Sequence, residues 1–243
     1  MEVSFASKRV LVTGAGQGIG RELAKKLAKC GAKVTAISKT EKYLKTLKEE
    51  SPTIRIVTAD VSSPDIRKTL RSLGPFDCLV NNAALAILEP VLETTDENFD
   101  KLFNVNVKGV FVVSQEVARM MVENKIKGSI VNLSSQASKC ALRDHLAYCA
   151  SKSAVDMLSK VMALELGEHG IRVNCVNPTV VMTAMGKIGW ADPAKANPLL
   201  ERIPLHRFAE VEEVVDPILF LLSDKASMIS GIEVPVDGGF LAC

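Results

Sequence analysis

The sequence predicts an α/β protein in which helices cover both faces of a seven-stranded parallel sheet. Three observations indicate this doubly wound class. Short β-branched runs alternate with longer segments of helical periodicity, the strand runs are almost entirely apolar, and no repeat or flexible linker interrupts the order. Because helices exclude water from both faces of such a sheet, its strands lack the polar alternation of half-exposed strands. We therefore expect a single domain over residues 1–243.

The expected strands are short runs rich in Val and Ile that end at turn or helix signals. In chain order they are Arg9–Thr13, Lys33–Ile37, Ile54–Thr58, Cys78–Val80, Ser129–Leu133, Arg172–Val176 and Glu233–Val236. The expected helices lie between them, at about Gly18–Cys30, Glu41–Glu49, Pro64–Leu73, Glu97–Asn124, Ala147–His169 and Val211–Ser223. In such a sheet all strands end at one edge, where α/β proteins bind their ligands.

One long segment, residues 178–205, shows no clear periodicity and contains Pro193, Pro198 and Pro204. Long excursions inside compact α/β domains are usually functional. We predict that this segment is a lid over a substrate, with a mobile surface loop as the alternative.

The composition argues against several classes of protein. Thirty basic and 28 acidic side chains give a net charge of only +2, and the basic residues are dispersed, so nucleic-acid binding is not expected. The most apolar stretch, Ile218–Leu222, is far shorter than a membrane span. The six cysteines form no C-x-x-C pair and the three histidines are isolated, so we expect no metal site. The N-terminus does not resemble a signal peptide, and we expect a cytoplasmic protein.

A glycine-rich turn follows the first expected strand, in Thr13-Gly14-Ala15-Gly16-Gln17-Gly18-Ile19-Gly20. It brings backbone N–H groups and a helix N-terminus toward an anion, as in the pyrophosphate site of Rossmann-type dinucleotide-binding domains. The spacing is G-x-x-x-G-x-G rather than the usual G-x-G-x-x-G. A tight turn that binds nothing is the alternative.

The end of the second expected strand indicates which dinucleotide binds. An acidic residue there accepts a hydrogen bond from the ribose 2′-hydroxyl in NAD-binding domains, but here the sequence reads Ser38-Lys39-Thr40. These side chains can donate hydrogen bonds and one charge to a 2′-phosphate, which favours NADPH over NADH. For Lys39 the alternative is a solvated loop lysine.

A candidate catalytic pair lies in Tyr148-Cys149-Ala150-Ser151-Lys152. On a helix these two side chains share a face, and a neighbouring ammonium makes a phenol a better proton donor. Ser134 and Ser135 end one strand and Asn81-Asn82-Ala83-Ala84 ends another, at the ligand-binding edge. Asn106 lies inside a long expected helix, where Asn is a mediocre helix former.

Together these motifs resemble the short-chain dehydrogenase/reductases. The glycine spacing, the Asn-Asn-Ala segment, the serine thirteen residues before the tyrosine and Y-x-x-x-K carry the resemblance, which covers the whole chain. It extends to Asn174-Cys175-Val176-Asn177-Pro178 and Asp237-Gly238-Gly239. Gln17 is a departure, because NADPH-preferring members carry a basic residue there.

The resemblance implies a role for each side chain of the active site. Tyr148 gives a proton to the substrate carbonyl oxygen while the nicotinamide gives a hydride to its carbon. Ser135 binds that oxygen, Lys152 holds the nicotinamide ribose, and Asn106 positions a water that resupplies the proton. The residues expected at the cofactor are Gly14, Gly16, Gln17, Gly18, Ile19, Gly20, Ser38, Lys39, Thr40, Asp60, Val61, Asn82, Ala83, Ala84, Tyr148, Lys152, Pro178, Val181 and Thr183.

The substrate is expected to contact Ser135, Gln136, His145, Tyr148 and Trp190. The alternative is a surface loop position for His145 and a packing role for Trp190. Segments such as Pro178–Thr183 and Gly239–Cys243 resemble the family members that reduce small ketoses, such as L-xylulose to xylitol, and α-dicarbonyls such as diacetyl. A reductase of 3-oxoacyl thioesters or steroid ketones, and a non-catalytic NADPH-binding scaffold, are the alternatives.

The resemblance also implies a homotetramer with two-fold axes. Its subunits would pair through the two long helices, Glu97–Asn124 and Ala147–His169, and through the C-terminal segment.

Overall fold

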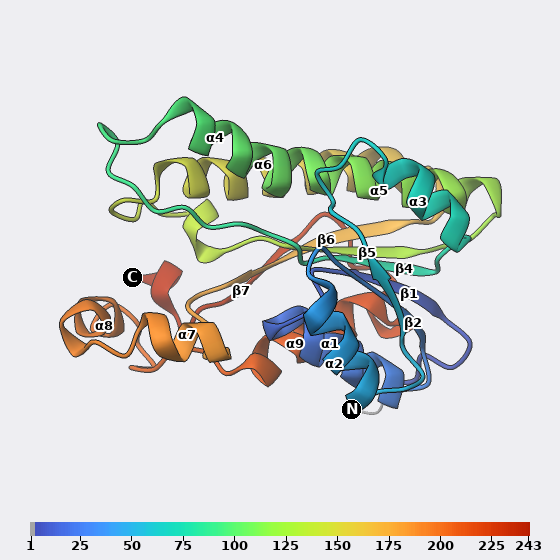
Figure 1. Cartoon of the computed structure of the whole chain (residues 1–243), viewed down its shortest axis with the longest axis horizontal. Coiled ribbons are helices and arrows are strands. Elements are labelled where there is room, and N and C mark those ends of the chain that lie inside the picture. The colour runs from blue at the N-terminus through green and yellow to red at the C-terminus, as the bar shows by residue number, and fades with distance from the viewer. Residues whose placement is uncertain (1–2) are drawn as a thin grey trace.

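The protein contains a single seven-stranded sheet in which all strands are parallel, as the sequence predicts (Figure 1). A computed structural model describes residues 3–243, apart from the side chains of residues 185 and 195. The strands are β1 Arg9–Thr13, β2 Lys33–Ser38, β3 Arg55–Thr58, β4 Cys78–Asn81, β5 Ser129–Leu133, β6 Arg172–Pro178 and β7 Glu233–Val236. Each predicted strand is present: β1, β5 and β7 have the predicted bounds, and the other strands differ at one end by one or two residues.

The strand order is β3-β2-β1-β4-β5-β6-β7. From β1 to β3 the chain adds strands toward one edge of the sheet, and from β4 to β7 it adds them toward the other edge, so the order of addition changes between β1 and β4. Crossovers that leave β1 and β4 toward opposite sides open a crevice above their carboxyl ends. Val10 and Leu11 of β1 pair with Cys78 and Leu79 of β4, so the glycine turn and the Asn-Asn-Ala segment emerge side by side.

Two helical layers cover the sheet (Figure 1). One contains α1 Gly18–Lys29, α2 Glu41–Glu50 and α9 Val211–Leu222, and the other contains α3 Ile66–Leu73, α5 Val110–Glu123 and α6 Leu146–Leu166. Successive strand residues face opposite layers: Val10 and Val12 pack into the core under α1 and α9, whereas Leu11 packs into the core under α3 and α5. The two cores explain why the strand runs are apolar throughout.

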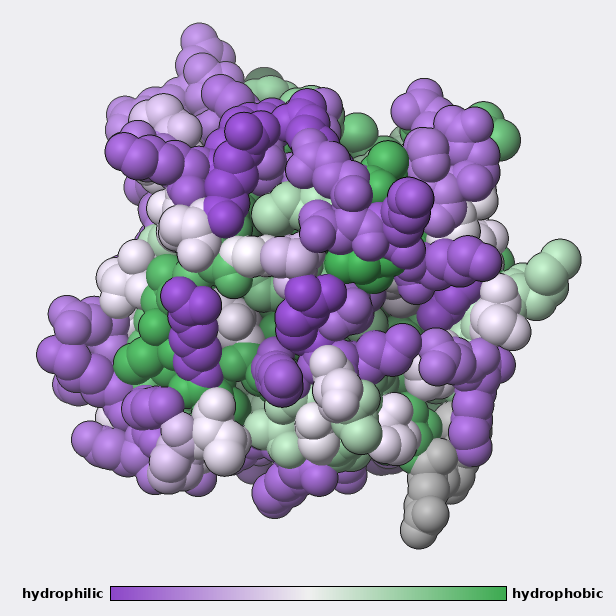
Figure 2. Space-filling view, turned by 90° about the vertical axis from the view of Figure 1, so that its right-hand side faces the viewer, coloured by the Kyte–Doolittle hydropathy of each residue, from purple (hydrophilic) through white to green (hydrophobic). Residues whose placement is uncertain are grey.

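The polar faces of the helices form much of the outer surface. Figure 2 shows the side at the right of Figure 1, which is mostly hydrophilic with smaller apolar patches. No helix in residues 3–243 is both long and apolar enough to cross a membrane.

The predicted continuous helix Glu97–Asn124 is wrong, because the structure divides it into three parts. Helix α4 covers Asp96–Phe103, a π-helical turn covers Asn104–Gly109, and α5 begins at Val110. The apolar periodicity does not register the one extra residue of a π turn. Asn106 lies at the centre of the turn and is buried.

Residues 178–205 also differ from the irregular segment that the sequence suggested, because they contain two helices. Helix α7 covers Ala184–Gly189 and α8 covers Pro193–Leu200. The side chains of Thr183 and Asp192 accept hydrogen bonds from the first turns of these helices. Pro193 occupies the first turn of α8, where proline is well tolerated. Short 3₁₀ turns at 136–138, 167–169, 224–226 and 240–242 complete the structure.

Candidate active site

The glycine turn is shaped by contact with the loop that follows β4. Gly14 has a φ of +64°, and a Cβ atom there would lie 2.7 Å from the Cα of Ala83. A Cβ on Gly20 would lie 2.4 Å from Nδ2 of Asn82. Side chains at these two positions would push the turn away from the β4 loop, so glycine is required there by the fold.

A polar clamp joins the same two loops. The Asn82 side chain donates to the carbonyl oxygens of Thr13 and Gly14, each at 3.1 Å. The Thr13 hydroxyl accepts hydrogen bonds from the backbone N–H groups of Asn82 and Ala83, each at 3.1 Å. The amide of Asn82 therefore binds the glycine turn, and it fixes the crevice between β1 and β4.

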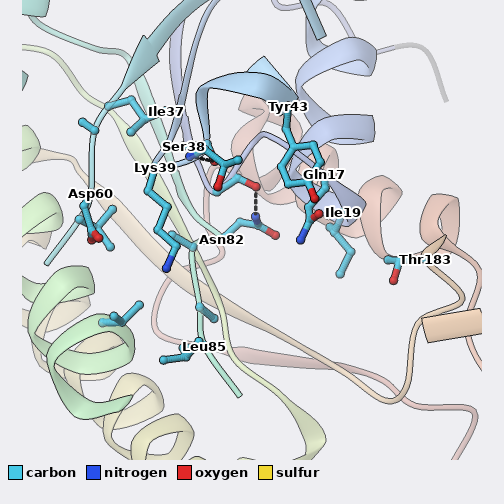
Figure 3. A pocket seen from close by; sticks show the side chains of 18 residues that line it. Gln17, Ile19, Ile37, Ser38, Lys39, Tyr43, Asp60, Asn82, Leu85 and Thr183 are labelled. Atoms are coloured by element: carbon cyan, nitrogen blue, oxygen red, sulfur yellow. Dashed lines mark hydrogen bonds between the residues drawn. The ribbon is translucent and has the colours of Figure 1, made fainter. Parts of the chain in front are cut away.

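A long cleft runs along this crevice (Figure 3). Thirteen of the residues predicted for the cofactor line it: Gly14, Gln17, Gly18, Ile19, Ser38, Lys39, Thr40, Asp60, Val61, Asn82, Ala83, Ala84 and Thr183. Five further lining residues were missed by the sequence analysis: Ile37, Tyr43, Ala59, Leu85 and Val105. Ile37, Ala59 and Leu85 directly adjoin predicted residues in the sequence, so they could have been found as apolar neighbours of the predicted residues.

The remaining predicted cofactor residues lie outside the lining of this cleft. Gly16 packs against Ser38 and Tyr43 below the cleft, and Gly20 packs against Asn82. Pro178 ends β6, and Val181 forms an isolated bridge with Ala209.

Asp60 and Lys39 are the charged residues among those that line the cleft in the described structure. Burial raises the pKa of the Asp60 carboxyl, but hydrogen bonds from the side chain and backbone of Ser62 and the charge of Lys39 outweigh burial, so the net pKa is lowered. Asp60 is therefore ionised at neutral pH.

Tyr148 and Lys152 lie one helical turn apart on α6, as predicted. The Lys152 ammonium is 5.8 Å from the centre of the Tyr148 ring. The Lys152 side chain is only 3% exposed, and its Nζ donates to the carbonyl oxygen of Leu133 at 2.7 Å. Burial lowers the pKa of Lys152 to about 8, so this ammonium can release a proton near neutral pH.

Burial raises the pKa of the Tyr148 phenol, and a hydrogen bond with Ser135 offsets that effect only in part. The phenol is therefore protonated at neutral pH, as a proton donor must be. The His145 ring lies edge-on to the Tyr148 ring, with 6.2 Å between the ring centres.

Ser135 is held rigidly just beyond the end of β5. Its side-chain oxygen accepts from the N–H of Ala137 at 3.1 Å, which caps a short 3₁₀ turn. Its carbonyl oxygen accepts from the hydroxyl of Ser138 at 2.7 Å and from Nδ2 of Asn177 at 3.3 Å. The structure thus brings Ser135, Tyr148 and Lys152 together at the carboxyl edge of the sheet.

Asn106 is part of this edge and holds the loop that follows β4. Its Oδ1 accepts from the N–H of Leu85 at 2.8 Å, and its Nδ2 donates to the carbonyl oxygen of Leu85 at 2.9 Å and to Oγ of Ser151 at 3.2 Å. The side chain therefore makes three hydrogen bonds within the protein. Its place in the π turn explains why an Asn occurs inside the helix that the sequence predicts.

The residues that were predicted to contact substrate have different surroundings in the structure. Gln136 is buried beside Ser135, and its Oε1 accepts no hydrogen bond from the described residues. The Trp190 ring packs on Phe208 with 5.4 Å between ring centres, within a cluster that also contains Ile203 and Phe240. Trp190 therefore has a packing role, and its contact with substrate stays a prediction. Within residues 3–243 no group of side chains is suited to hold a metal ion.

Comparisons with known proteins identify the family of this chain. Residues 14–241 match a family model described as enoyl-(acyl carrier protein) reductase. The chain is 55% identical to the D-erythrulose reductase of Gallus gallus over 99% of this chain and 98% of the relative. It is 54% identical to the L-xylulose reductase of Homo sapiens over the full length of both, and 50% identical to the carbonyl reductase [NADPH] 2 of Sus scrofa, also over the full length of both.

Solved structures give the same result. A short-chain type dehydrogenase/reductase from Mycobacterium ulcerans superimposes with a TM-score of 0.94 at 30% identity, covering 99% of this chain and 92% of that chain. A gluconate 5-dehydrogenase from Burkholderia cenocepacia, in complex with NADP and tartrate, gives 0.93 at 30% identity, covering 100% of this chain and 98% of that chain. The motifs, the sheet and the relatives agree, and the chain belongs to the short-chain dehydrogenase/reductase family of oxidoreductases.

Proposed function

We propose that the protein reduces small ketoses and α-dicarbonyls with NADPH, and that L-xylulose, reduced to xylitol, is its principal substrate. The observation that carries this proposal is the meeting of Ser135, Tyr148 and Lys152 at the carboxyl edge of the sheet, the edge at which the cleft between β1 and β4 also lies. Full-length relatives at 50–55% identity that are named for L-xylulose, D-erythrulose and carbonyl reduction support the substrate class.

The cleft suits NADPH. Within the glycine turn, Gly14 and Gly18 line the cleft with backbone alone, and Gly18, with a φ of +57°, lies close to Thr183. Ser38, Lys39 and Thr40 would hold the 2′-phosphate, Asp60 and Val61 the adenine, and Asn82–Ala84 the nicotinamide ribose. Val181 and Thr183 would hold the nicotinamide carboxamide. When bound, the nicotinamide supplies the hydride that the reduction consumes.

The side chains of this protein supply the proton that accompanies the hydride. Ser135 donates a hydrogen bond to the substrate carbonyl oxygen and orients it, and Tyr148 transfers its phenolic proton to that oxygen as the alcohol forms. The Lys152 ammonium holds the nicotinamide ribose and stabilises the phenolate that results. Lys152 then returns a proton to Tyr148 by way of water held near Asn106.

Gln136 and His145 flank this group and would contact the hydroxyls or second carbonyl of a substrate. The unpartnered Oε1 of Gln136 supports such a contact, because a buried amide oxygen is costly without a donor. Residues 178–205, with α7 and α8, would close over the substrate.

We further propose a homotetramer that assembles through α5 and α6 and the C-terminal segment, in a cytoplasmic enzyme. Exposed apolar side chains on these two helices, including Phe111, Met157 and Leu164, support the interface. All six cysteines are free thiols, as is usual in a reducing compartment.

A substrate panel tests the proposed activity. NADPH oxidation is followed with L-xylulose, diacetyl, an acetoacetyl thioester and a steroid ketone at equal concentrations. We expect the highest kcat/KM with L-xylulose and diacetyl, and product analysis to identify xylitol. A higher kcat/KM with the thioester or the steroid would replace the proposed substrate, and no turnover with any carbonyl would favour a scaffold.

A further inference from the structure

The cleft presents an unusual set of groups to a phosphate. Among its described lining residues Lys39 is the one cation and Asp60 the one anion, so their formal charges cancel. Gln17 occupies the turn position where a second cation would favour a doubly charged 2′-phosphate. A cleft with so little net positive charge needs neutral hydrogen-bond donors to hold that group.

Tyr43 is such a donor in a suitable place. It is 42% exposed and lines the cleft from α2, one helical turn after Thr40. In Figure 3 its ring points into the cleft between Ser38 and Gln17. Its aromatic surface and its hydroxyl both face the space that a ligand would fill.

The position of Tyr43 is fixed by its neighbours. A Cβ on Gly16 would lie 3.0 Å from the Cβ of Tyr43 and 2.9 Å from Oγ of Ser38, so both residues pack closely against Gly16. Nη1 of Arg21 donates to the carbonyl oxygens of Gly16 and Tyr43, at 3.1 and 2.9 Å. The same guanidinium pairs with Glu50 at 2.8 Å, so α1, the glycine turn and α2 are joined behind the ring.

We propose that the Tyr43 hydroxyl donates a hydrogen bond to the 2′-phosphate of the cofactor and that Tyr43 is a specificity-determining residue of this cleft. The proposal rests on the proposed use of NADPH. Tyr43 compensates for the absent second cation, because it supplies one more hydrogen-bond donor beside those of Ser38, Lys39 and Thr40 without adding charge. A phenol that donates to a doubly charged phosphate forms a charge-assisted hydrogen bond, which is stronger than a neutral one.

The test uses binding of cofactor fragments, which needs no turnover. The affinities of 2′,5′-ADP and 5′-AMP, which differ by the 2′-phosphate, are measured by calorimetry for the wild type, Tyr43→Phe and Tyr43→Leu. Lys42→Gln is the matched control, because Lys42 is exposed on the same turn of α2 and does not line the cleft. We expect Tyr43→Phe to weaken 2′,5′-ADP about tenfold and to change 5′-AMP less than about twofold.

The outcomes separate this inference from the choice of cofactor. If the wild type prefers 2′,5′-ADP and both Tyr43 variants keep the full preference, the role of Tyr43 is refuted while NADPH use stands. If Tyr43→Phe behaves as the wild type and only Tyr43→Leu is weaker, the ring packs against the ligand and the proposed hydrogen bond is wrong. If the wild type does not distinguish the two fragments, the proposed preference for NADPH is wrong, and the role of Tyr43 at the 2′-phosphate is refuted with it. A loss in Lys42→Gln as large as in Tyr43→Phe would assign the effect to general charge and overturn the proposal.

Discussion

At the scale of single residues, the site depends on burial more than on direct charge contact. The sequence suggested that Lys152 favours ionisation of Tyr148, but in the structure burial raises the pKa of the phenol and lowers that of the ammonium. Both effects favour the return of a proton from Lys152 to a Tyr148 phenolate, because the phenol becomes the weaker acid and the ammonium the stronger one.

The lowered pKa of Lys152 predicts a pH dependence of stability in the cofactor-free protein. The pKa is about 8 in the folded state against 10.5 for the unfolded chain, so the unfolded chain binds more protons between these values. Relative to Lys152→Met, the wild type should gain roughly 3 kcal/mol of unfolding free energy as the pH rises through this window. Urea denaturation of both proteins at several pH values measures the difference. A difference that does not change with pH would contradict the burial of a titrating ammonium.

Residues of the candidate site could be predicted from the sequence where a motif indicates their chemistry. Ser135, Tyr148 and Lys152 meet at the predicted edge because strand ends and i, i+4 spacing fix their positions. Tyr43 was not predicted to line the cleft, because its helix is rich in charge and its neighbours give no sign of a ligand. Its exposure to the cleft follows from the placement of α2 against the glycine turn, which is a tertiary contact.

At the scale of elements, strands were predicted better than helices. Apolar runs between turns define the strands of a buried parallel sheet, whereas the π turn at Asn104–Gly109 has no periodic signal. The one sign of this π turn in the sequence was the polar residue Asn106 inside an expected helix. Helices α7 and α8 were missed because they are short and residues 178–205 show no clear periodicity. Helix α8 also contains two prolines, of which Pro193 lies in the first turn, where a helix accepts proline.

The exposed face of α6 carries a prediction about assembly. Leu164 is 82% exposed, and Met157 and Val161 are exposed near it along the same helix. If α6 forms a subunit interface, Leu164→Glu places a charge in an apolar contact and should shift the tetramer toward dimers or monomers in light scattering. Lys68→Glu on α3, an exposed charge reversal outside the proposed interface, is the control. A wild type that is monomeric at micromolar concentration would refute the tetramer.

At the scale of the whole molecule, strand order determines where chemistry occurs. The reversal between β1 and β4 opens the cleft, and the next strand, β5, carries Ser135 to its edge. The clamp between Asn82 and the glycine turn fixes one wall of this cleft, while Asn106 ties the following loop to α6. The topology was predictable from the alternation of elements, whereas these side-chain clamps could not be, because they join residues far apart in the sequence.

The proposed proton transfer by Tyr148 is tested most directly by Tyr148→Phe, which removes the hydroxyl and keeps the ring. The measurement is kcat/KM for L-xylulose with NADPH, together with the dissociation constant of NADPH from fluorescence. Loss of general acid catalysis should lower kcat/KM by about 10²–10⁴-fold while NADPH still binds. A variant that keeps most of its activity, with NADPH bound as tightly as in the wild type, would contradict the assignment of Tyr148 as the proton donor.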